Sequence, residues 1–188
     1  HTPGLKVVIP STPYDAKGLL LAAIDDPDPV MVFEPMKLYR AFRQEVPEEP
    51  FRVPLGKARV VREGKDVTII SWGAPVLMVE KVAGQLAAEK GLSIEVIDLR
   101  SLVPLDMETL VRSVEKTGRL IVVHEAVRTS GFASEIITRI NEEAFYSLEA
   151  PMVRLTGYDT PYPVPQVEDD WLPNEPRLLR AIEQVLAD

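Results

Sequence analysis

Polar and aromatic residues follow each predicted strand in the second half of the chain, where they could do chemistry. They are Trp72-Gly73, Asp98-Leu99-Arg100, His124-Glu125 with Arg128, and Gly157-Tyr158-Asp159. Ligands of open α/β sheets usually lie outside the carboxyl ends of the strands. A histidine, two carboxylates and two arginines in one crevice would make an acid–base site or a site for a small anion. The alternative, which we favour, is that these residues cap helices or contact another subunit.

The sequence motifs of several enzyme classes are missing. There is no G-x-G-x-x-G and no P-loop glycine–lysine pattern, which argues against a nucleotide-binding oxidoreductase. His124-Glu125 begins like the zinc motif H-E-x-x-H, but Arg128 stands where the second histidine is needed. No serine lies in a G-x-S-x-G turn. The chain therefore carries no self-sufficient catalytic constellation.

Two further polar pairs have a functional and a structural interpretation. Ser130-Gly131 precedes a predicted helix, so we expect Thr129 or Ser130 to be its N-cap rather than a nucleophile. Asp169-Asp170 could hold a hard cation, but a solvated acidic pair is the preferred interpretation.

The first 34 residues have the pattern of a βαβ unit. Apolar runs at 4–9 and 30–33 flank a predicted helix with Thr12 as N-cap, Pro13 at its first position and Asp15 in its first turn. One helix and two strands cannot cover both faces of a sheet. We therefore expect residues 1–34 to be the C-terminal end of a larger α/β domain.

Residues 35–56 are rich in proline and charge and predict a linker, with a possible short helix from Lys37 to Gln44. Residues 57–188 alternate strands with helices. Runs at 58–62 and 67–72 resemble a hairpin, and strands are predicted at 93–98, 119–123 and 152–156. Helices are predicted at 76–90, 106–117 and 132–145, and from about residue 176, with a loop at 157–174. The expected fold is α/β, with a mostly parallel five-stranded sheet, helices on both faces and the first hairpin strand at an edge.

Composition sets limits on the function. The chain has 188 residues, of which 46% are apolar and 27% charged, as is usual for a globular protein. The absence of cysteine excludes disulfide scaffolds, thiolate catalysis and cysteine-ligated metals. A net charge of −8 disfavours broad binding to nucleic acids or anionic membranes. We expect a cytoplasmic protein. Because the first residue is His1 rather than Met, we expect either that something was removed or that the chain is part of a longer one.

Several segments together resemble one family. In order, they are HTPGLKVVIPSTPYDAKGLL, DPVMVFEPMKLYR, EVPEEPFRVPLGKARVVREGKDVTIISWG, EVIDLRSLVPLD, SVEKTGRLIVVHEA, GFASEI, LEAPMVRLTGYDTPYP and WLP. They resemble the C-terminal part of the beta subunit of thiamine-diphosphate-dependent 2-oxo acid dehydrogenases. The resemblance covers essentially the whole chain and implies a fold like the C-terminal domain of transketolase over residues 57–188. It also implies that 1–34 is the remnant of a pyrimidine-binding domain.

The resemblance implies one subunit of a larger enzyme. In the family, a beta subunit pairs with an alpha subunit and a second beta subunit. The assembly decarboxylates a 2-oxo acid and passes the acyl group to a lipoyl acyltransferase. Thiamine diphosphate and magnesium belong to the assembled enzyme, and the family's catalytic glutamate and histidine lie upstream of His1. We therefore expect no catalytic, cofactor-binding or metal-binding residue on this chain, no cofactor bound by it alone, and no nucleic-acid or membrane partner.

Five residues receive roles by the resemblance. Glu149 and the terminal carboxylate of Asp188 are predicted to bind the subunit-binding domain of the acyltransferase by charge-assisted pairing; the alternative is a pair of solvated acids. His124, Glu125 and Phe132 are predicted at the subunit interface.

The substrate is left open by the sequence. HEAVRTSGFASEI and GYDTPYP are closer to branched-chain 2-oxo acid members, whereas HTPGLKVVIPSTPYDAKGLL and MKLYRAFRQEVPE are closer to pyruvate members. We lean to branched-chain substrates. The alternative function is an independent α/β protein-binding module with no catalytic role.

Overall fold

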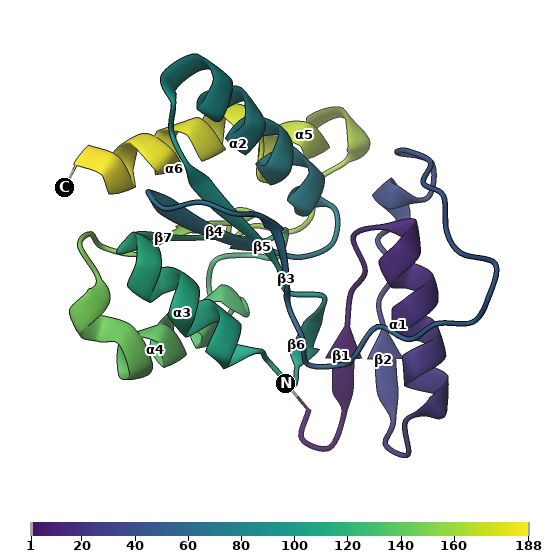
Figure 1. The fold of residues 1–188 in the computed structure, drawn as a ribbon. Coiled ribbons are helices and arrows are strands. Elements are labelled where there is room, and N and C mark those ends of the chain that lie inside the picture. The colour runs from purple at the N-terminus through teal and green to yellow at the C-terminus, as the bar shows by residue number, and fades with distance from the viewer. Residues whose placement is uncertain (1, 188) are drawn as a thin grey trace.

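The chain forms two α/β units that lie side by side (Figure 1). This computed structural model describes residues 2–187. The larger unit has a five-stranded sheet in the order β3-β5-β4-β7-β8. The strands are β3 (Arg59–Arg62), β4 (Val67–Ser71), β5 (Ile94–Asp98), β7 (Leu120–Val123) and β8 (Val153–Leu155). All neighbours pair in parallel except β3, which is an antiparallel edge strand. The expected sheet, with its first strand at an edge, is confirmed.

Helices cover both faces of the larger sheet, as expected (Figure 1). One face packs against α2 (Pro75–Lys90) and α6 (Glu175–Ala187), and the other against α3 (Met107–Thr117) and α4 (Ala133–Ala144). The central strand β4 is buried on both faces: Ile69 contacts the first layer and Ile70 the second, because successive side chains alternate across a strand. Burying each such side chain stabilises the folded state by about 1.5–3 kcal/mol relative to leaving it exposed.

The helix boundaries in the larger unit follow from local chemistry. The carboxylate of Asp106 caps α3 by accepting from the backbone N–H of Thr109. Gly91 and Gly118 end α2 and α3 with φ values of 68° and 67°, a left-handed conformation that suits glycine. These boundaries match the sequence prediction. The long loop also contains a 3₁₀ turn (Pro165–Val167) and the short helix α5 (Glu168–Trp171).

The predicted hairpin is wrong. The strand β3 pairs with β5, so that Val60 lies opposite Ile97, and β4 lies on the far side of β5. The connecting segment crosses the start of β5, where Lys65 and Asp66 donate backbone hydrogen bonds to the carbonyl of Ser93. Because β5 and β7 occupy both edges of β4, no edge remains there for β3.

The predicted helix at 37–44 is also wrong. Only a 3₁₀ turn forms, at Met36–Leu38, closed by a bond from the Leu38 N–H to the Pro35 carbonyl. Most side chains of the segment are exposed, and a helix of eight residues is too short to be stable without packing against a core.

The smaller unit consists of β1 (Lys6–Val8), α1 (Pro13–Asp25) and β2 (Val30–Val32), and its two strands are parallel, as predicted. The hydroxyl of Thr12 accepts from the Asp15 N–H and caps α1, which is also as predicted. A third strand, β6 (Ser101–Val103), comes from the larger unit and pairs antiparallel with β1. This strand was not anticipated. It follows β5 after Arg100, whose φ of 54° turns the chain into the smaller sheet.

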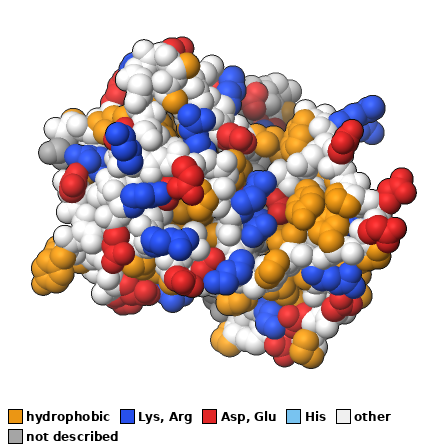
Figure 2. All heavy atoms as spheres, in the orientation of Figure 1, with side chains coloured by type: hydrophobic (Ala, Val, Ile, Leu, Met, Phe, Trp, Pro, Cys, Tyr) orange, Lys and Arg blue, Asp and Glu red, His pale blue; other side chains and the backbone are white. Residues whose placement is uncertain are grey.

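The smaller unit leaves apolar side chains on its surface. Among residues 2–187, the buried apolar residues of its core are Val8, Leu19 and Val53. Ile24 on α1 is 69% exposed, and Phe33 after β2 is 50% exposed. Figure 2 shows hydrophobic side chains gathered over this side of the molecule. Such exposure agrees with a unit that needs further elements to cover it.

Within residues 2–187, no helix has the length and apolar content that a membrane crossing requires.

Candidate functional site

The strand-end residues form two separate groups rather than one crevice. Asp98 ends β5 and His124 follows β7, and the strand β4 lies between them. Asp98 bonds to residues of the smaller unit, whereas the ring of His124 stacks on Trp72. Among the described residues, Asp98 and His124 share no hydrogen bond, so they do not form the acid–base crevice, which was the less favoured of the two interpretations.

Asp98 is a fully buried carboxylate at the junction of the two units. Its Oδ2 accepts from the hydroxyl of Ser11 and lies 3.4 Å from Nη2 of Arg59, and its Oδ1 accepts from the backbone N–H of Arg100 at 3.2 Å. Burial raises the pKa of Asp98 to about 6, against the opposing effects of Ser11 and Arg59.

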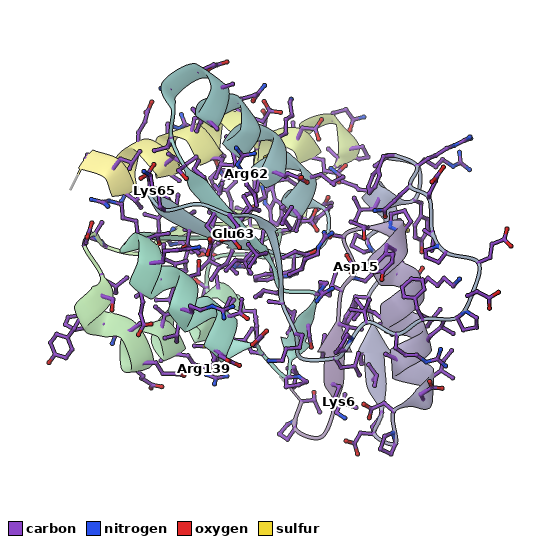
Figure 3. All side chains as sticks on the ribbon, in the orientation of Figure 1. Lys6, Asp15, Arg62, Glu63, Lys65 and Arg139 are labelled. Atoms are coloured by element: carbon purple, nitrogen blue, oxygen red, sulfur yellow. The ribbon has the colours of Figure 1, made fainter. Side chains whose placement is uncertain are left out.

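Asp15 on α1 completes this junction cluster, which we define as Ser11, Asp15, Arg59, Asp98 and Arg100. Figure 3 labels Asp15 on the side of α1 that faces the larger unit. Its carboxylate is 1% exposed and lies 3.1 Å from Nη1 of Arg100 and 3.6 Å from Nη2 of Arg59. Arg100 also donates to the Lys57 carbonyl at 2.9 Å. The cluster therefore fixes α1 to the larger unit, and its role is structural.

His124 is packed as a core residue. It is 1% exposed, and its ring lies 5.3 Å from that of Trp72 at an interplanar angle of 8°. Burial, with a contribution from Arg154, lowers its pKa to about 4, so the ring is neutral at pH 7. Neither ring nitrogen has a hydrogen-bond partner among the described residues. Phe132 meets the Trp72 ring edge-on at 6.0 Å.

Glu125 lies close to His124 in sequence but has different surroundings. It is partly buried and lines a hollow that Lys37 and the first residue of α2, Pro75, also line. Burial raises the pKa of its carboxyl, Lys37 opposes this, and Glu168 adds to it. The predicted interface role of His124, Glu125 and Phe132 is not tested by these contacts and stays a prediction.

Glu149 lies on the surface, with its side chain 61% exposed. Its Oε2 is 2.6 Å from Nη1 of Arg119, and Nε of Arg119 donates to the carbonyl of Val185 at 3.0 Å. Glu149 is thus held near the end of α6. Asp188, its predicted companion, lies outside the described residues.

Thr129 and Ser130 do not cap α4, which corrects the sequence prediction. The helix begins at Ala133 without a side-chain cap, and its first bond joins the Ser134 N–H to the Gly131 carbonyl. Thr129 instead binds the carboxylate of Asp159 through its backbone N–H and its hydroxyl, both at 2.8 Å. The helix starts four residues after Thr129, with Phe132 rather than Thr129 or Ser130 at the N-cap position.

The described residues offer no donor set for a metal. Among residues 2–187, no group of three or more His, Cys, Asp or Glu side chains is arranged to hold one. Asp169 is fully exposed and lies 3.6 Å from Nζ of Lys37. These residues therefore do not fit magnesium, and we assign no step of a cofactor reaction to them.

Sequence reasoning missed the junction cluster and a group of arginines near α6. The members of the junction cluster are far apart in sequence: Asp15 and Arg100 are separated by 85 positions. The only local signal was Asp15 in the first turn of α1, which the capping pattern already explained.

Two family models match the chain. The model described as "Transketolase, C-terminal domain" matches residues 56–178, and "Transketolase, pyrimidine binding domain" matches residues 1–41. The chain belongs to the transketolase C-terminal domain family. A solved structure, "Split gene transketolase, inactive beta4 tetramer", aligns with a TM-score of 0.81 and 26% identity, over 98% of this chain and 58% of that chain.

Curated relatives are more similar still. The chain is 54% identical over 184 residues to "Pyruvate dehydrogenase E1 component subunit beta" of Bacillus subtilis (strain 168), covering 98% of this chain and 56% of that protein. It is also 54% identical over 164 residues to "2-oxoisovalerate dehydrogenase subunit beta, mitochondrial" of Dictyostelium discoideum. This match covers 87% of this chain and 44% of that protein. The resemblance read from the sequence is confirmed. The chain spans about half the length of these relatives.

Proposed function

We propose that this chain is the C-terminal part of the beta subunit of a thiamine-diphosphate-dependent 2-oxo acid dehydrogenase. The observation that carries the proposal is the 54% identity to a pyruvate dehydrogenase E1 beta subunit over 98% of the chain. The assembled enzyme would remove carbon dioxide from a 2-oxo acid and transfer the acyl group to a lipoyl acyltransferase. We propose that this portion serves assembly and docking.

The division of the chain is part of the proposal. We place a remnant of the pyrimidine-binding domain at 1–34, a linker at 35–56 and a transketolase C-terminal-like domain at 57–188. The two family matches, to residues 1–41 and 56–178, support this division. So do the separate cores of the two sheets.

We propose the partners by analogy with the relatives. An alpha subunit and a second beta subunit would complete the enzyme, with His124, Glu125 and Phe132 near the interface, and the assembly would hold thiamine diphosphate with magnesium. We place the protein in the cytoplasm. An independent binding module with no catalytic role is the weaker alternative, because the chain matches two domain families of the same enzymes in their order.

The docking partner would be the basic subunit-binding domain of the acyltransferase. Glu149 supports this role because it is exposed and held by Arg119 near the end of α6. An arginine or lysine of the partner could pair with the same carboxylate, which has two oxygens to share. The carboxylate of Asp188 would add a second charge.

Reconstitution tests the proposal. The intact beta subunit that contains this chain is mixed with its alpha subunit, and carbon dioxide release is measured with pyruvate and with 2-oxoisovalerate. We expect activity only in the mixture. The preference for branched-chain substrates inferred from the sequence predicts that 2-oxoisovalerate is the better substrate. A mixture that assembles but releases no carbon dioxide from either acid would overturn the enzymatic assignment.

A further inference from the structure

Four arginines surround one hollow of about 270 Å³ between α6, β8 and the segment after β7. Arg177 and Arg180 come from α6, Arg154 from β8, and Arg128 from the segment after β7. We call this hollow the arginine pocket. Its other lining residues are apolar except for Gln184, and none is acidic.

Within the described chain, the carboxylate of Asp159 attracts the charge of Arg128, but no carboxylate pairs directly with an arginine of the arginine pocket. No ion pair among residues 2–187 involves any of the four arginines. Eight of the thirteen arginines form no ion pair within the described residues, and four of those eight line this one hollow. Four like charges around one hollow repel one another, and an anion would remove that repulsion.

Neutral groups bind three of the four guanidinium groups. Arg177 donates to the carbonyls of Thr156 at 2.5 Å and of Trp171 and Leu172 at 3.1 Å, and it lies 4.3 Å from the centre of the Tyr158 ring. These contacts fix its position and leave its positive charge uncompensated. Burial lowers the pKa of Arg177, and the nearby Arg180 lowers it further, although arginine stays charged at pH 7.

Arg154 and Arg128 hold each other in a similar way. Nη1 of Arg154 donates to the Ser134 hydroxyl at 2.6 Å and to the Arg128 carbonyl at 3.2 Å. Nη1 of Arg128 donates to the Arg154 carbonyl at 3.4 Å. Preorganised donors lose little conformational entropy when a ligand binds.

We propose that the arginine pocket binds a small phosphoryl-bearing anion. Planar guanidinium groups match the oxygens of a phosphoryl group in bidentate geometry, and several of them together suit a dianion. A hollow of about 270 Å³ suits a compact anion better than an acidic protein segment, which would need an extended basic surface. The proposal goes beyond the proposed function and does not depend on it.

Calorimetry on the intact protein that carries this chain, with any subunits that copurify, tests the site. Inorganic phosphate and AMP are titrated separately at constant ionic strength set with sodium chloride. The test variant is Arg180→Glu, at an exposed position of α6, and the matched control is Arg43→Glu, at an exposed position of the linker. Circular dichroism checks that both variants are folded.

We expect saturable binding of at least one probe, weakened tenfold or more by Arg180→Glu and unchanged by Arg43→Glu. Equal affinities for the two probes would identify the free phosphate group as the ligand, and tighter AMP binding would identify an organic phosphate. Absence of saturable binding, or equal binding by Arg180→Glu and the unaltered protein, overturns the proposal. Poly-glutamate is titrated as a third probe. If it binds, if Arg180→Glu weakens that binding, and if neither phosphate probe binds, the proposal is overturned in favour of an acidic protein partner.

Discussion

Arg119 joins Glu149 to the end of the last helix: its guanidinium lies 2.6 Å from the Glu149 carboxylate and donates to the carbonyl of Val185. The bridge positions an exposed acid that the sequence alone could not distinguish from any other surface carboxylate. It also keeps the carboxylate of Glu149 ordered before a partner arrives.

Replacing Glu149 tests the docking role. We expect Glu149→Gln to weaken binding of the acyltransferase's subunit-binding domain at least tenfold, because the charge that pairs with the partner is lost. Binding by the unaltered protein should also weaken as salt rises. Calorimetry measures both effects. Glu143→Gln, at another surface ion pair, is the control and should bind with unchanged affinity. Equal affinities of the two variants would show that Glu149 does not contact the subunit-binding domain.

Asp98 makes the stability depend on pH. Its pKa is raised from 3.8 to about 6 in the folded protein, so the folded state binds the proton more tightly than the unfolded state does. Its stabilising contribution is present below pH 4 and is lost as pH rises through 6. We therefore expect Asp98→Asn to become more stable relative to the unaltered protein between pH 4 and 6.5, by up to about 3 kcal/mol. Urea unfolding across this pH range measures the difference in unfolding free energy between Asp98→Asn and the unaltered protein. A difference that does not change with pH would contradict the raised pKa of Asp98.

His124 has the opposite effect on stability over nearly the same range. Its pKa is lowered from 6.5 to about 4, so the unfolded state binds the proton more tightly. The stability it contributes is present above pH 6.5 and is lost as pH falls toward 4. We expect His124→Phe, which keeps a ring beside Trp72, to resist acid unfolding better than the unaltered protein. Acid titration followed by tryptophan fluorescence measures this, and identical midpoints would show that His124 does not titrate as described.

Asp15 anchors the smaller unit. We expect Asp15→Ala to destabilise the protein by about 3–5 kcal/mol, because it removes the buried carboxylate that pairs with Arg100. Hydrogen exchange should rise in α1 more than in β4. Asp25→Ala, which removes an exposed ion pair with Arg52, should cost less than about 1 kcal/mol. Similar costs for the two variants would argue against the anchoring role.

Gly131 is required by close packing against His124. A Cβ at this position would lie 2.6 Å from Cε1 of His124 and 2.5 Å from the Val127 carbonyl oxygen. We expect Gly131→Ala to destabilise by about 1–3 kcal/mol. Gly84→Ala, within α2 and with open space around it, should stabilise by about 0.5–1 kcal/mol. Thermal unfolding compares the stability of the two variants. If Gly131→Ala is as stable as the unaltered protein, His124 is loosely packed.

Local signals predicted much of the fold. Thr12 and Pro13 marked the start of α1, and Gly91 and Gly118 marked the ends of two helices. Alternating strands and helices predicted the larger sheet and its two helical layers. Each of these features depends on residues close together in the chain, so spacing and residue type sufficed.

Long-range pairing could not be predicted in the same way. The strand β6 is three residues long and forms only because β1, more than 90 positions away, offers an edge. The pairing of β3 with β5 instead of β4 depends on the register of the whole sheet. The arginine pocket likewise gathers residues from β8, α6 and the segment after β7, and none of those segments has a basic motif of its own.

The central claim is that this chain is one part of a shared enzyme and lacks the groups that bind its cofactor. Calorimetry with thiamine diphosphate and magnesium tests it most directly, on the 188-residue chain alone and on the full beta subunit assembled with its alpha partner. We expect saturable binding by the assembly and none by the chain. Micromolar binding of the cofactor by the chain alone would contradict the claim.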